Sequence, residues 1–385
     1  MRADPSIEQA GEGDERRERR TAALLFFATL LSVYLVYGYS WTGGDPLQDW
    51  QTAAASAQFS ITLMGILLAH EMGHYLVALR HGFRLSLPYF LPFPAAFGTF
   101  GAIIRLRSLP RSRTALLEMG AAGPLAGFAV AMLAFAVGLP GTIERDAPQI
   151  LLDTSALLAA PPPPGALDAL LDQAFSVPPL SWLLSVPPSG TVSMLIMANP
   201  PGMDLIGELL LGAAPGRYAE LSPIGMAGWV GCLLTGINLL PIGQLDGGHI
   251  LNALAPRAAP WVSRVGVVLA LVAGTMWTGW LVWGAMLLFL RAWMSLPVPE
   301  HPGLTPRARF VGLLALLAFA LSFMPSPLEI EDVPLDQIHF VDADGNRVPP
   351  PSLDPPVAAP AAEGAPESAV EGGGPTQQAV DQGGR

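Results

Sequence analysis

A histidine pair inside a long apolar run places the strongest constraint on this sequence. Residues 66–77 read ILLAHEMGHYLV, with His70 and His74 four positions apart and Glu71 directly after His70. On an α-helix, residues four apart lie one above the other on the same face, so both imidazoles can reach one metal ion. Glu71 then lies beside the metal, where a general base for hydrolysis is needed. Three ionisable groups in one turn of an apolar helix are costly in lipid, so they predict a functional site.

The alternative is that these are satisfied core histidines and that the H-E-x-x-H pattern arose by chance. The chain has only 6 histidines among 385 residues. Two of them at metal-binding spacing within a lipid-length segment favour the metal site over this alternative.

A second stretch contains a candidate third ligand. Residues 238–249 read NLLPIGQLDGGH, so Asp246 follows an apolar segment that proline and glycine interrupt. A carboxylate on broken backbone at membrane depth is tolerated only where protein buries it or water reaches it. Taken alone, the stretch favours a simpler alternative, in which Asp246 caps a helix that begins near Gly247.

Together the two stretches resemble the site-2 protease family of intramembrane zinc metalloproteases. That family carries H-E-x-x-H on one transmembrane helix and N-x-x-P…L-D-G on a later one, as residues 70–74 and 238–247 do here. Residues 87–94, 98–102 and 120–127 also resemble a branch of the family. The resemblance covers residues 55–130 and 222–325. It implies that His70, His74 and Asp246 bind Zn²⁺ and that Glu71 is the general base.

Composition and apolar runs predict an all-α polytopic membrane protein. Hydrophobic residues make up 51% of the chain and charged residues only 13%. We expect about six transmembrane helices and a small β-hairpin near the active site. The expected helical segments are 21–41, 52–80, 114–139, 223–240, the short pair 261–276 and 279–293, and 310–323.

The expected organisation has five parts. These are a cytoplasmic N-terminus (1–20), a first half of the membrane core (21–139), an extracytoplasmic insertion (140–221), a second half of the core (222–325) and an acidic tail (326–385). Short amphipathic helices are expected at 166–175 and 204–212, and a strand pair within 328–348. The Pro-, Ala- and Gly-rich composition predicts disorder beyond residue 350.

Arginine placement predicts the orientation, since all 20 basic residues are arginines. Arg16, Arg17, Arg19 and Arg20 precede the first apolar segment, which favours a cytoplasmic N-terminus. The arginines of residues 80–113 and 257–309 then fall on the same side, whereas the insertion contains two arginines. We expect an integral protein of a bacterial cytoplasmic membrane, with the insertion and the tail outside. The single Cys232 excludes an intrachain disulfide.

Residues 97–106 predict a short hairpin or strand at the membrane surface. We expect it to hold an extended substrate by strand addition, with Gly98, Thr99, Phe100 and Gly101 as substrate-binding residues. The alternative is a hairpin that only braces the helices. Asn238 either hydrogen-bonds the substrate or pairs with backbone groups that Pro241 frees.

Several nearby positions have local interpretations. Gly123 and Gly127 form a G-x-x-x-G pair, which suits close helix packing. Glu118, near the start of the same segment, suits the helix dipole better than a metal. His249 is predicted to be structural or to support the ligands, because three ligands and a water complete a tetrahedron. His81 is predicted to lie at the membrane interface.

The expected function is zinc-dependent proteolysis within the membrane. Its expected partners are transmembrane protein substrates and the lipid bilayer, with no nucleic acid; the oligomeric state is not predicted. One alternative is a catalytically inactive relative that binds membrane helices, which the intact Glu71 disfavours. The other is a metal transporter, which the lack of internal repeats and of several midplane polar residues disfavours.

Overall fold

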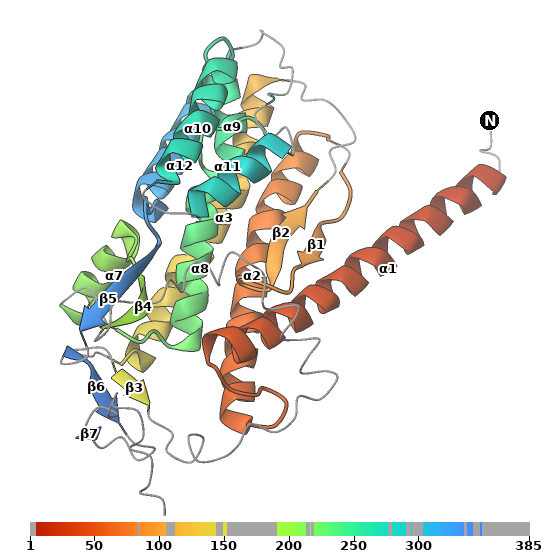
Figure 1. Cartoon of the computed structure of the whole chain (residues 1–385). Helices are drawn as coiled ribbons and strands as arrows, with labels where there is room; N and C mark the ends of the chain where they lie inside the picture. Colours follow the sequence, from red (N-terminus) through yellow and green to blue (C-terminus); the bar gives the residue numbers. More distant parts are fainter. Residues whose placement is uncertain are drawn as a thin grey trace, which may run out of the picture.

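The computed structural model describes residues 5–83, 85–104, 112–143, 149–151, 191–212, 216, 219–275, 279–289, 294, 303–334, 337–341 and 347–348. Helices dominate this part of the chain, as Figure 1 shows. The helix predicted at 166–175 and the tail beyond residue 350 lie outside the described residues. The helix predicted at 204–212 is confirmed, as α7 (Pro201–Leu211).

The helices mostly follow the apolar runs, whereas the first helix begins in the polar segment before the first run. They are α1 (Pro5–Val36, continued by a π-helical turn at Tyr37–Trp41), α2 (Trp50–Arg80), α3 (Arg113–Gly138, followed by a 3₁₀ turn at Leu139–Gly141), α7, α8 (Pro223–Asn238), α9 (Asp246–Leu254), α10 (Ala259–Ala273), α11 (Gly279–Phe289) and α12 (Pro306–Ser322). Polar caps start four of them, because Asp49, Ser112, Ser222 and Thr305 each accept a backbone N–H of the first turn.

Three helical segments are long and apolar enough to cross a membrane among the described residues: Arg16–Trp41, Trp50–Arg80 and Arg113–Gly141. The expectation of six crossings is therefore not confirmed. The helices α8 and α12 contain 16 and 17 residues. At helical rise they extend ~25 Å, short of a ~30 Å hydrocarbon core. For α8 the sequence indicates a local cause. The helix ends at Asn238, just before the proline- and glycine-containing loop that leads to Asp246.

Helix α3 lies at the centre of the molecule. It packs against α2, α8, α9 and α12, and α2 also packs against α8. The large side chains Phe59, Phe135 and Trp229, one from each of α2, α3 and α8, are fully buried in the shared core. The segments that carry the two sequence motifs are thus brought together around α3.

The predicted hairpin is confirmed as a small two-stranded sheet, and its place at the membrane surface stays a prediction. Strands β1 (Tyr89–Pro92) and β2 (Thr99–Ile103) pair antiparallel and lie beside α1 and α2 (Figure 1). The backbone of the turn is tied to α1, since Ser32 donates to the carbonyl of Phe93 and Trp41 Nε1 donates to that of Ala96. The turn of the hairpin therefore lies beside Trp41, the last residue of the first candidate span.

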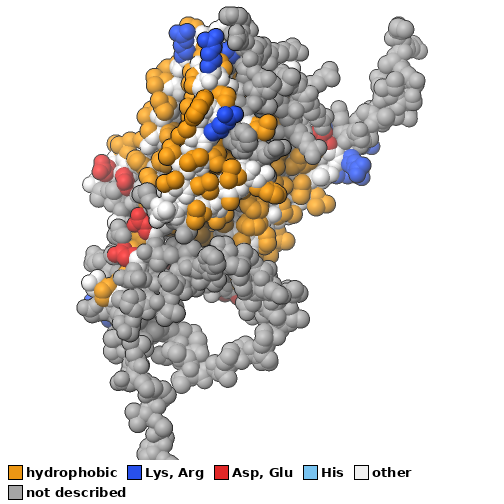
Figure 2. All heavy atoms as spheres, turned by 45° about the horizontal axis from the view of Figure 1, so that its top comes forward, with side chains coloured by type: hydrophobic (Ala, Val, Ile, Leu, Met, Phe, Trp, Pro, Cys, Tyr) orange, Lys and Arg blue, Asp and Glu red, His pale blue; other side chains and the backbone are white. Residues whose placement is uncertain are grey.

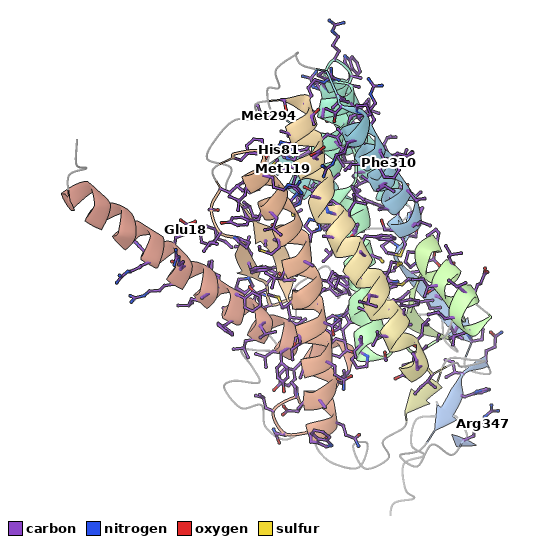
Figure 3. The ribbon with its side chains drawn as sticks, turned by 180° about the vertical axis from the view of Figure 1, so that it is seen from behind. Glu18, His81, Met119, Met294, Phe310 and Arg347 are labelled. Atoms are coloured by element: carbon purple, nitrogen blue, oxygen red, sulfur yellow. The ribbon has the colours of Figure 1, made fainter. Side chains whose placement is uncertain are left out.

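The insertion and the segment after α12 form sheets with each other. Strand β4 (Thr191–Met197) pairs antiparallel with β5 (Leu328–Pro334). Strand β6 (His339–Val341) pairs parallel with β3 (Gln149–Leu151) and antiparallel with β7 (Arg347–Val348). Strands are confirmed in 328–348, but their main partners lie in the insertion. These two regions therefore share one end of the molecule, which also holds the labelled Arg347 in Figure 3.

The described surface suits a lipid environment. Figure 2 shows a broad hydrophobic face with basic side chains at its top and acidic side chains lower down. Large apolar side chains are exposed along the long helices, among them Phe27 of α1, Ile61 of α2 and Leu133 of α3, each more than 60% exposed. Exposed apolar surface of this extent marks an interface with lipid or protein.

Candidate metal centre

His70, His74 and Asp246 meet at one point between α2 and α9. Their nearest ligand atoms all lie within 4.8 Å of one another. His70 Nε2 lies 3.2 Å from one carboxylate oxygen of Asp246, and His74 Nε2 lies 3.3 Å from the other. The two Nε2 atoms are 3.2 Å apart. The structure thus brings together the three residues that the sequence motifs single out.

These separations fit a tetrahedral zinc site. With zinc–nitrogen and zinc–oxygen distances near 2.0–2.1 Å, the edges of a tetrahedron are about 3.3 Å long. The distance of 3.2 Å between the two Nε2 atoms matches that edge length, and the two histidines approach different carboxylate oxygens of Asp246, at 3.2 and 3.3 Å. Two imidazoles and a carboxylate are also a donor set that catalytic zinc sites use. The residues present therefore fit the metal that the motifs imply.

The backbone of α3 fixes the orientation of His74. Its Nδ1 donates a hydrogen bond to the carbonyl of Met119 at 2.8 Å. This bond places the proton on Nδ1 and leaves the lone pair of Nε2 free for a metal. Figure 3 shows Met119 near the end of α3 that lies beside the C-terminal half of α2.

Two glycines of α3 make room for the histidine rings. A Cβ atom on Gly123 would overlap the His74 ring, and one on Gly127 would approach His70 Nδ1 to 3.0 Å. The G-x-x-x-G pair therefore does more than let two helix backbones approach. It forms the surface against which both rings lie.

Glu71 lies at the site but outside the cluster of three. Its side chain is only 9% exposed and is close enough to His74 and Asp246 to interact with both electrostatically. It follows His70 on α2. A carboxylate beside the donor set, and not part of it, has the position of a general base.

Asp246 does not cap α9. It is the first residue of that helix, the N-cap position is Leu245, and no side chain caps this end by a hydrogen bond. The carboxylate points instead at His70 and His74. The simpler alternative from the sequence, a capping aspartate, is therefore wrong.

The predicted substrate-binding residues lie on two other elements. Asn238 is the last residue of α8, and Thr99, Phe100 and Gly101 lie on β2, directly after Gly98. Ala102 of β2 packs against the same hydrophobic cluster as Ile66 and Leu67, which lie one turn before His70 on α2. Strand β2 also contacts α2, and the binding role of the hairpin stays a prediction.

The remaining ionisable groups near the site have separate roles. His249 lies one turn after Asp246 on α9, and its buried Nδ1 has no hydrogen-bond partner in the described part of the chain. Glu118 accepts a hydrogen bond from His81 Nε2 at 2.9 Å and lies 3.8 Å from Arg307 Nε. It lies beyond the first turn of α3, so the helix-dipole interpretation is wrong. Its carboxylate joins α2, α3 and α12.

Sequence reasoning missed three groups that form hydrogen bonds at or near the cluster. The Met119 carbonyl is a backbone atom, and no residue type signals it. Ser263 and Arg113 hydrogen-bond the backbone on either side of Asp246. Both are remote from the motifs in sequence, so only the fold identifies them.

Comparison with known proteins agrees with this geometry. The chain is 29% identical to the probable zinc metalloprotease EGY2, chloroplastic, of Arabidopsis thaliana over 292 residues, 74% of this chain and 44% of that protein. It is 30% identical to the probable zinc metalloprotease EGY1, chloroplastic, of Arabidopsis thaliana over 283 residues, 70% of this chain and 43% of that protein. A third relative is the probable zinc metalloprotease EGY3, chloroplastic, of Oryza sativa subsp. japonica, 27% identical over 68% of this chain and 41% of that protein. The chain spans less than half the length of these relatives. No solved structure matches it.

The sequence model of peptidase family M50 matches residues 58–273, more than half of the chain. The matched segment contains both motifs and all three members of the His–His–Asp cluster. It confirms the resemblance seen in the sequence, and the chain therefore belongs to peptidase family M50, the family of the site-2 proteases.

Proposed function

We propose that this protein is an intramembrane zinc metalloprotease that hydrolyses peptide bonds in or near transmembrane segments of other membrane proteins. The observation that carries the proposal is the place of the site. His70, Glu71 and His74 lie within α2, a helix long and apolar enough to cross a membrane. A hydrolytic centre on such a helix is built to meet substrates that are themselves in the membrane. Transmembrane proteins and lipid are the expected partners, and no nucleic acid is expected.

We assign His70, His74 and Asp246 as the zinc ligands and Glu71 as the general base. Bound zinc supplies a Lewis acid and an activated water for amide hydrolysis. The nearly buried Glu71 accepts a proton from the attacking water and delivers it to the leaving amine. Met119 keeps His74 in the ligating tautomer throughout, because its carbonyl holds the proton on Nδ1.

The substrate is held in an extended form along β2. A helical peptide bond is shielded, so a transmembrane substrate must unwind locally, which frees backbone groups that lipid cannot satisfy. A strand edge satisfies them without reading side chains. The contacts of β2 with α2, the helix that carries His70, support this arrangement. Gly98, Thr99, Phe100 and Gly101 would contact the substrate strand, and Asn238 would hydrogen-bond its backbone.

The five-part organisation and the orientation belong to the same proposal. The N-terminus (1–20) is placed in the cytoplasm, the core is 21–139 and 222–325, and the insertion (140–221) and the tail (326–385) lie outside. The pairing of β3 and β4 with strands after α12 supports one common side for the last two parts. Arginine placement motivates the orientation, a bacterial cytoplasmic membrane stays a prediction, and the plant relatives are chloroplastic by name.

The test is cleavage by the full chain reconstituted in lipid vesicles with a transmembrane test substrate. The wild type should bind zinc and cleave, and a chelator should stop cleavage. Glu71→Gln should keep its zinc and lose turnover by about 100-fold or more. Unchanged cleavage by Glu71→Gln would overturn the mechanism. Zinc binding without any cleavage by the wild type would indicate an inactive relative, and zinc flux into the vesicles would indicate a transporter.

A further inference from the structure

Helix α9, which carries Asp246, is short for an element that must hold a ligand in place. It has 9 residues, and helices of this length are marginal without external contacts. A metal ligand must be held within about 0.5 Å of its productive position. The position of Asp246 therefore depends on what holds the two ends of α9.

The loop before α9 is held by a serine of α10. Gly243, three residues before Asp246, adopts φ 36°, a left-handed conformation that glycine tolerates. Its N–H donates to Ser263 Oγ at 2.9 Å, and this fully buried hydroxyl donates to the carbonyl of Ala259 at 2.7 Å. Both hydrogen-bonding functions of Ser263 are thus engaged, and one of them fixes the bend that leads to Asp246.

The end of α9 is held by an arginine of α3. Arg113 Nε donates to the carbonyl of Ala253 at 2.7 Å, and its Nη2 donates to that of Leu254 at 2.8 Å. These two carbonyls belong to the last turn of α9, where helix carbonyls lack partners within the helix. The rigid guanidinium fork satisfies both at once and so fixes the direction of the helix.

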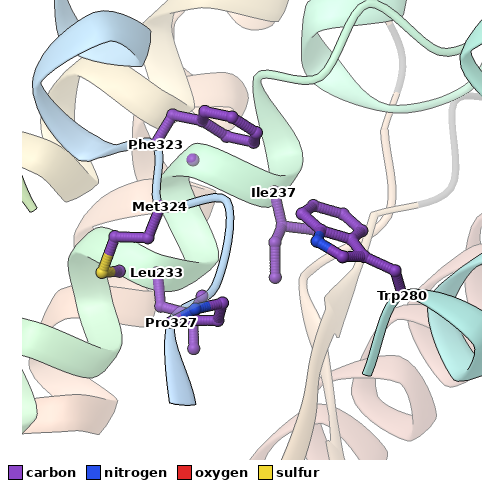
Figure 4. A pocket seen from close by; sticks show the side chains of 7 residues that line it. Leu233, Ile237, Trp280, Phe323, Met324 and Pro327 are labelled. Atoms are coloured by element: carbon purple, nitrogen blue, oxygen red, sulfur yellow. The ribbon is translucent and has the colours of Figure 1, made fainter. Parts of the chain in front are cut away.

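Helix α10, which carries Ser263, is held in place by its packing against α11 and the loop before α9. Ile242 of the loop is 2% exposed and is buried with Val267 of α10 and Leu287 of α11. Trp280 of α11 donates through Nε1 to the carbonyl of Pro325 at 2.6 Å. Figure 4 shows Trp280 beside Ile237 and facing the segment of Phe323, Met324 and Pro327, which line a small apolar pocket with it. The pair of α10 and α11 is thus attached both to the Asp246 loop and to the segment after α12.

We propose that Ser263 and Arg113 are positioning residues for the carboxylate of Asp246. Ser263 fixes the bend before α9 and Arg113 fixes the last turn, so that together they set where the carboxylate lies relative to His70 and His74. This inference rests on the proposed function, because it takes Asp246 to be a zinc ligand. It adds two residues outside both sequence motifs to the metal centre.

The test measures zinc affinity of the purified full chain by chelator competition. Ser263→Ala and Arg113→Gln should each weaken zinc binding by about 10- to 100-fold, as the loss of groups that support metal ligands typically does. Arg113→Lys can make only part of the contact and should give an intermediate loss. The Co²⁺-substituted protein should show changed ligand-field bands in the same variants, since its spectrum reports the ligand geometry.

Matched controls separate positioning from general stability. Ser322→Ala removes a fully buried hydroxyl of α12 that bonds a carbonyl of its own helix, and Arg80→Gln removes an exposed arginine at the end of α2. Both controls should keep wild-type zinc affinity. If Ser263→Ala and Arg113→Gln lower only the unfolding temperature of the zinc-free protein and leave zinc affinity at the control level, the inference is overturned.

Asp246→Ala distinguishes this inference from the proposed function. If Asp246→Ala binds zinc as tightly as the wild type, the proposed ligand set is wrong and the inference falls with it. If Asp246→Ala loses zinc while both positioning variants match their controls, the ligand set stands and only the inference fails.

Discussion

The Nδ1 atom of His74 donates a hydrogen bond to the backbone carbonyl of Met119 at 2.8 Å. This bond connects the metal-site helix α2 to α3, the helix at the centre of the molecule. It leaves the lone pair of Nε2 free for a metal, 3.3 Å from Asp246. Because the acceptor is a backbone atom, the bond depends on the axial and rotational position of α3 and not on the identity of residue 119. The metal centre is therefore sensitive to how closely α2 and α3 approach.

Gly123→Ala should disrupt the metal centre. The added methyl group would overlap the His74 ring, so the ring must move or the two helices must separate. We expect zinc affinity to fall by at least about 10-fold, as for other changes that misplace a ligand. Zinc titration of the purified variant measures this.

Gly65→Ala is the matched control, since it lies on α2 and a Cβ there meets no atom within 4 Å. It should leave zinc affinity unchanged and raise helix stability by up to about 1 kcal/mol. Equal zinc affinity in the two variants would show that the contact between Gly123 and His74 does not constrain the ligand.

Glu118→Ala should destabilise the junction of α2, α3 and α12. The carboxylate is 14% exposed and accepts a hydrogen bond from His81 at 2.9 Å. Hydrogen bonds to charged groups contribute about 1.5–3 kcal/mol, and we expect a loss of that size in the free energy of unfolding. Arg307→Gln should cost less than about 1 kcal/mol, because this side chain is 68% exposed and 3.8 Å away. Denaturant titration in detergent measures the free energy of unfolding of both variants. A larger loss in Arg307→Gln than in Glu118→Ala would contradict the view that His81 is the main partner of Glu118.

The motifs predicted the cluster of His70, His74 and Asp246 because the residue types themselves carry the signal. His70, Glu71, His74 and Asp246 are costly at membrane depth, so their presence in apolar segments is enough to imply a site. The packing that supports them was not predictable, since it uses backbone atoms such as the Met119 carbonyl and contacts between distant segments such as Ser263 with Gly243. The expectation of six crossings is not confirmed, because hydropathy reports apolar content and not helix length, and α8 ends at Asn238, before the break that precedes Asp246.

The insertion and the segment after α12 should be linked by an engineered disulfide. Met197 of β4 and Leu328 of β5 are directly opposed in the antiparallel pair. Cysteines at these two positions, in a Cys232→Ala background, should form a disulfide under mild oxidation, because opposed Cβ atoms lie within disulfide reach. Gel mobility after limited proteolysis measures the link. Cysteines at Met197 and Glu329, one position out of register, should link much less.

The N-terminus of α2 should loosen at low pH. Hydrogen bonds from Thr52 and Gln51 hold the pKa of Asp49 below its ordinary value of 3.8. A lowered pKa means that the cap stabilises the helix fully above the ordinary pKa and loses this effect as the pH falls through the lowered one. The protection factor of the Thr52 amide, which is the exchange rate of an unstructured peptide at the same pH divided by that of the amide, should therefore fall below that pH. Asp49→Asn keeps an acceptor oxygen and should remove this pH dependence; an unchanged pH profile would contradict the role of the carboxylate.

Substrate should bind beside β2 as a strand, which cysteine crosslinking can detect. Phe100 and Ile103 of β2 are 58% and 53% exposed. Cysteines at these positions, in a Glu71→Gln, Cys232→Ala background, should crosslink to cysteines placed along a bound test substrate. An extended substrate presents alternate residues to one side, so crosslinks should recur at every second substrate position. A cysteine at Leu209, an equally apolar position on α7 that is 80% exposed, is the control and should not crosslink.

The spacing of the crosslinks decides between the two roles of the hairpin. A repeat of three or four residues would mean that the substrate stays helical at β2, and crosslinks no stronger than those of Leu209 would mean that the hairpin only braces α1 and α2. Proline at Gly101 is a poor test of the same idea, since φ there is +87° and proline requires about −65°. That change would distort β2 itself. Crosslinking leaves the backbone of the hairpin intact and reports directly on the conformation of the bound substrate.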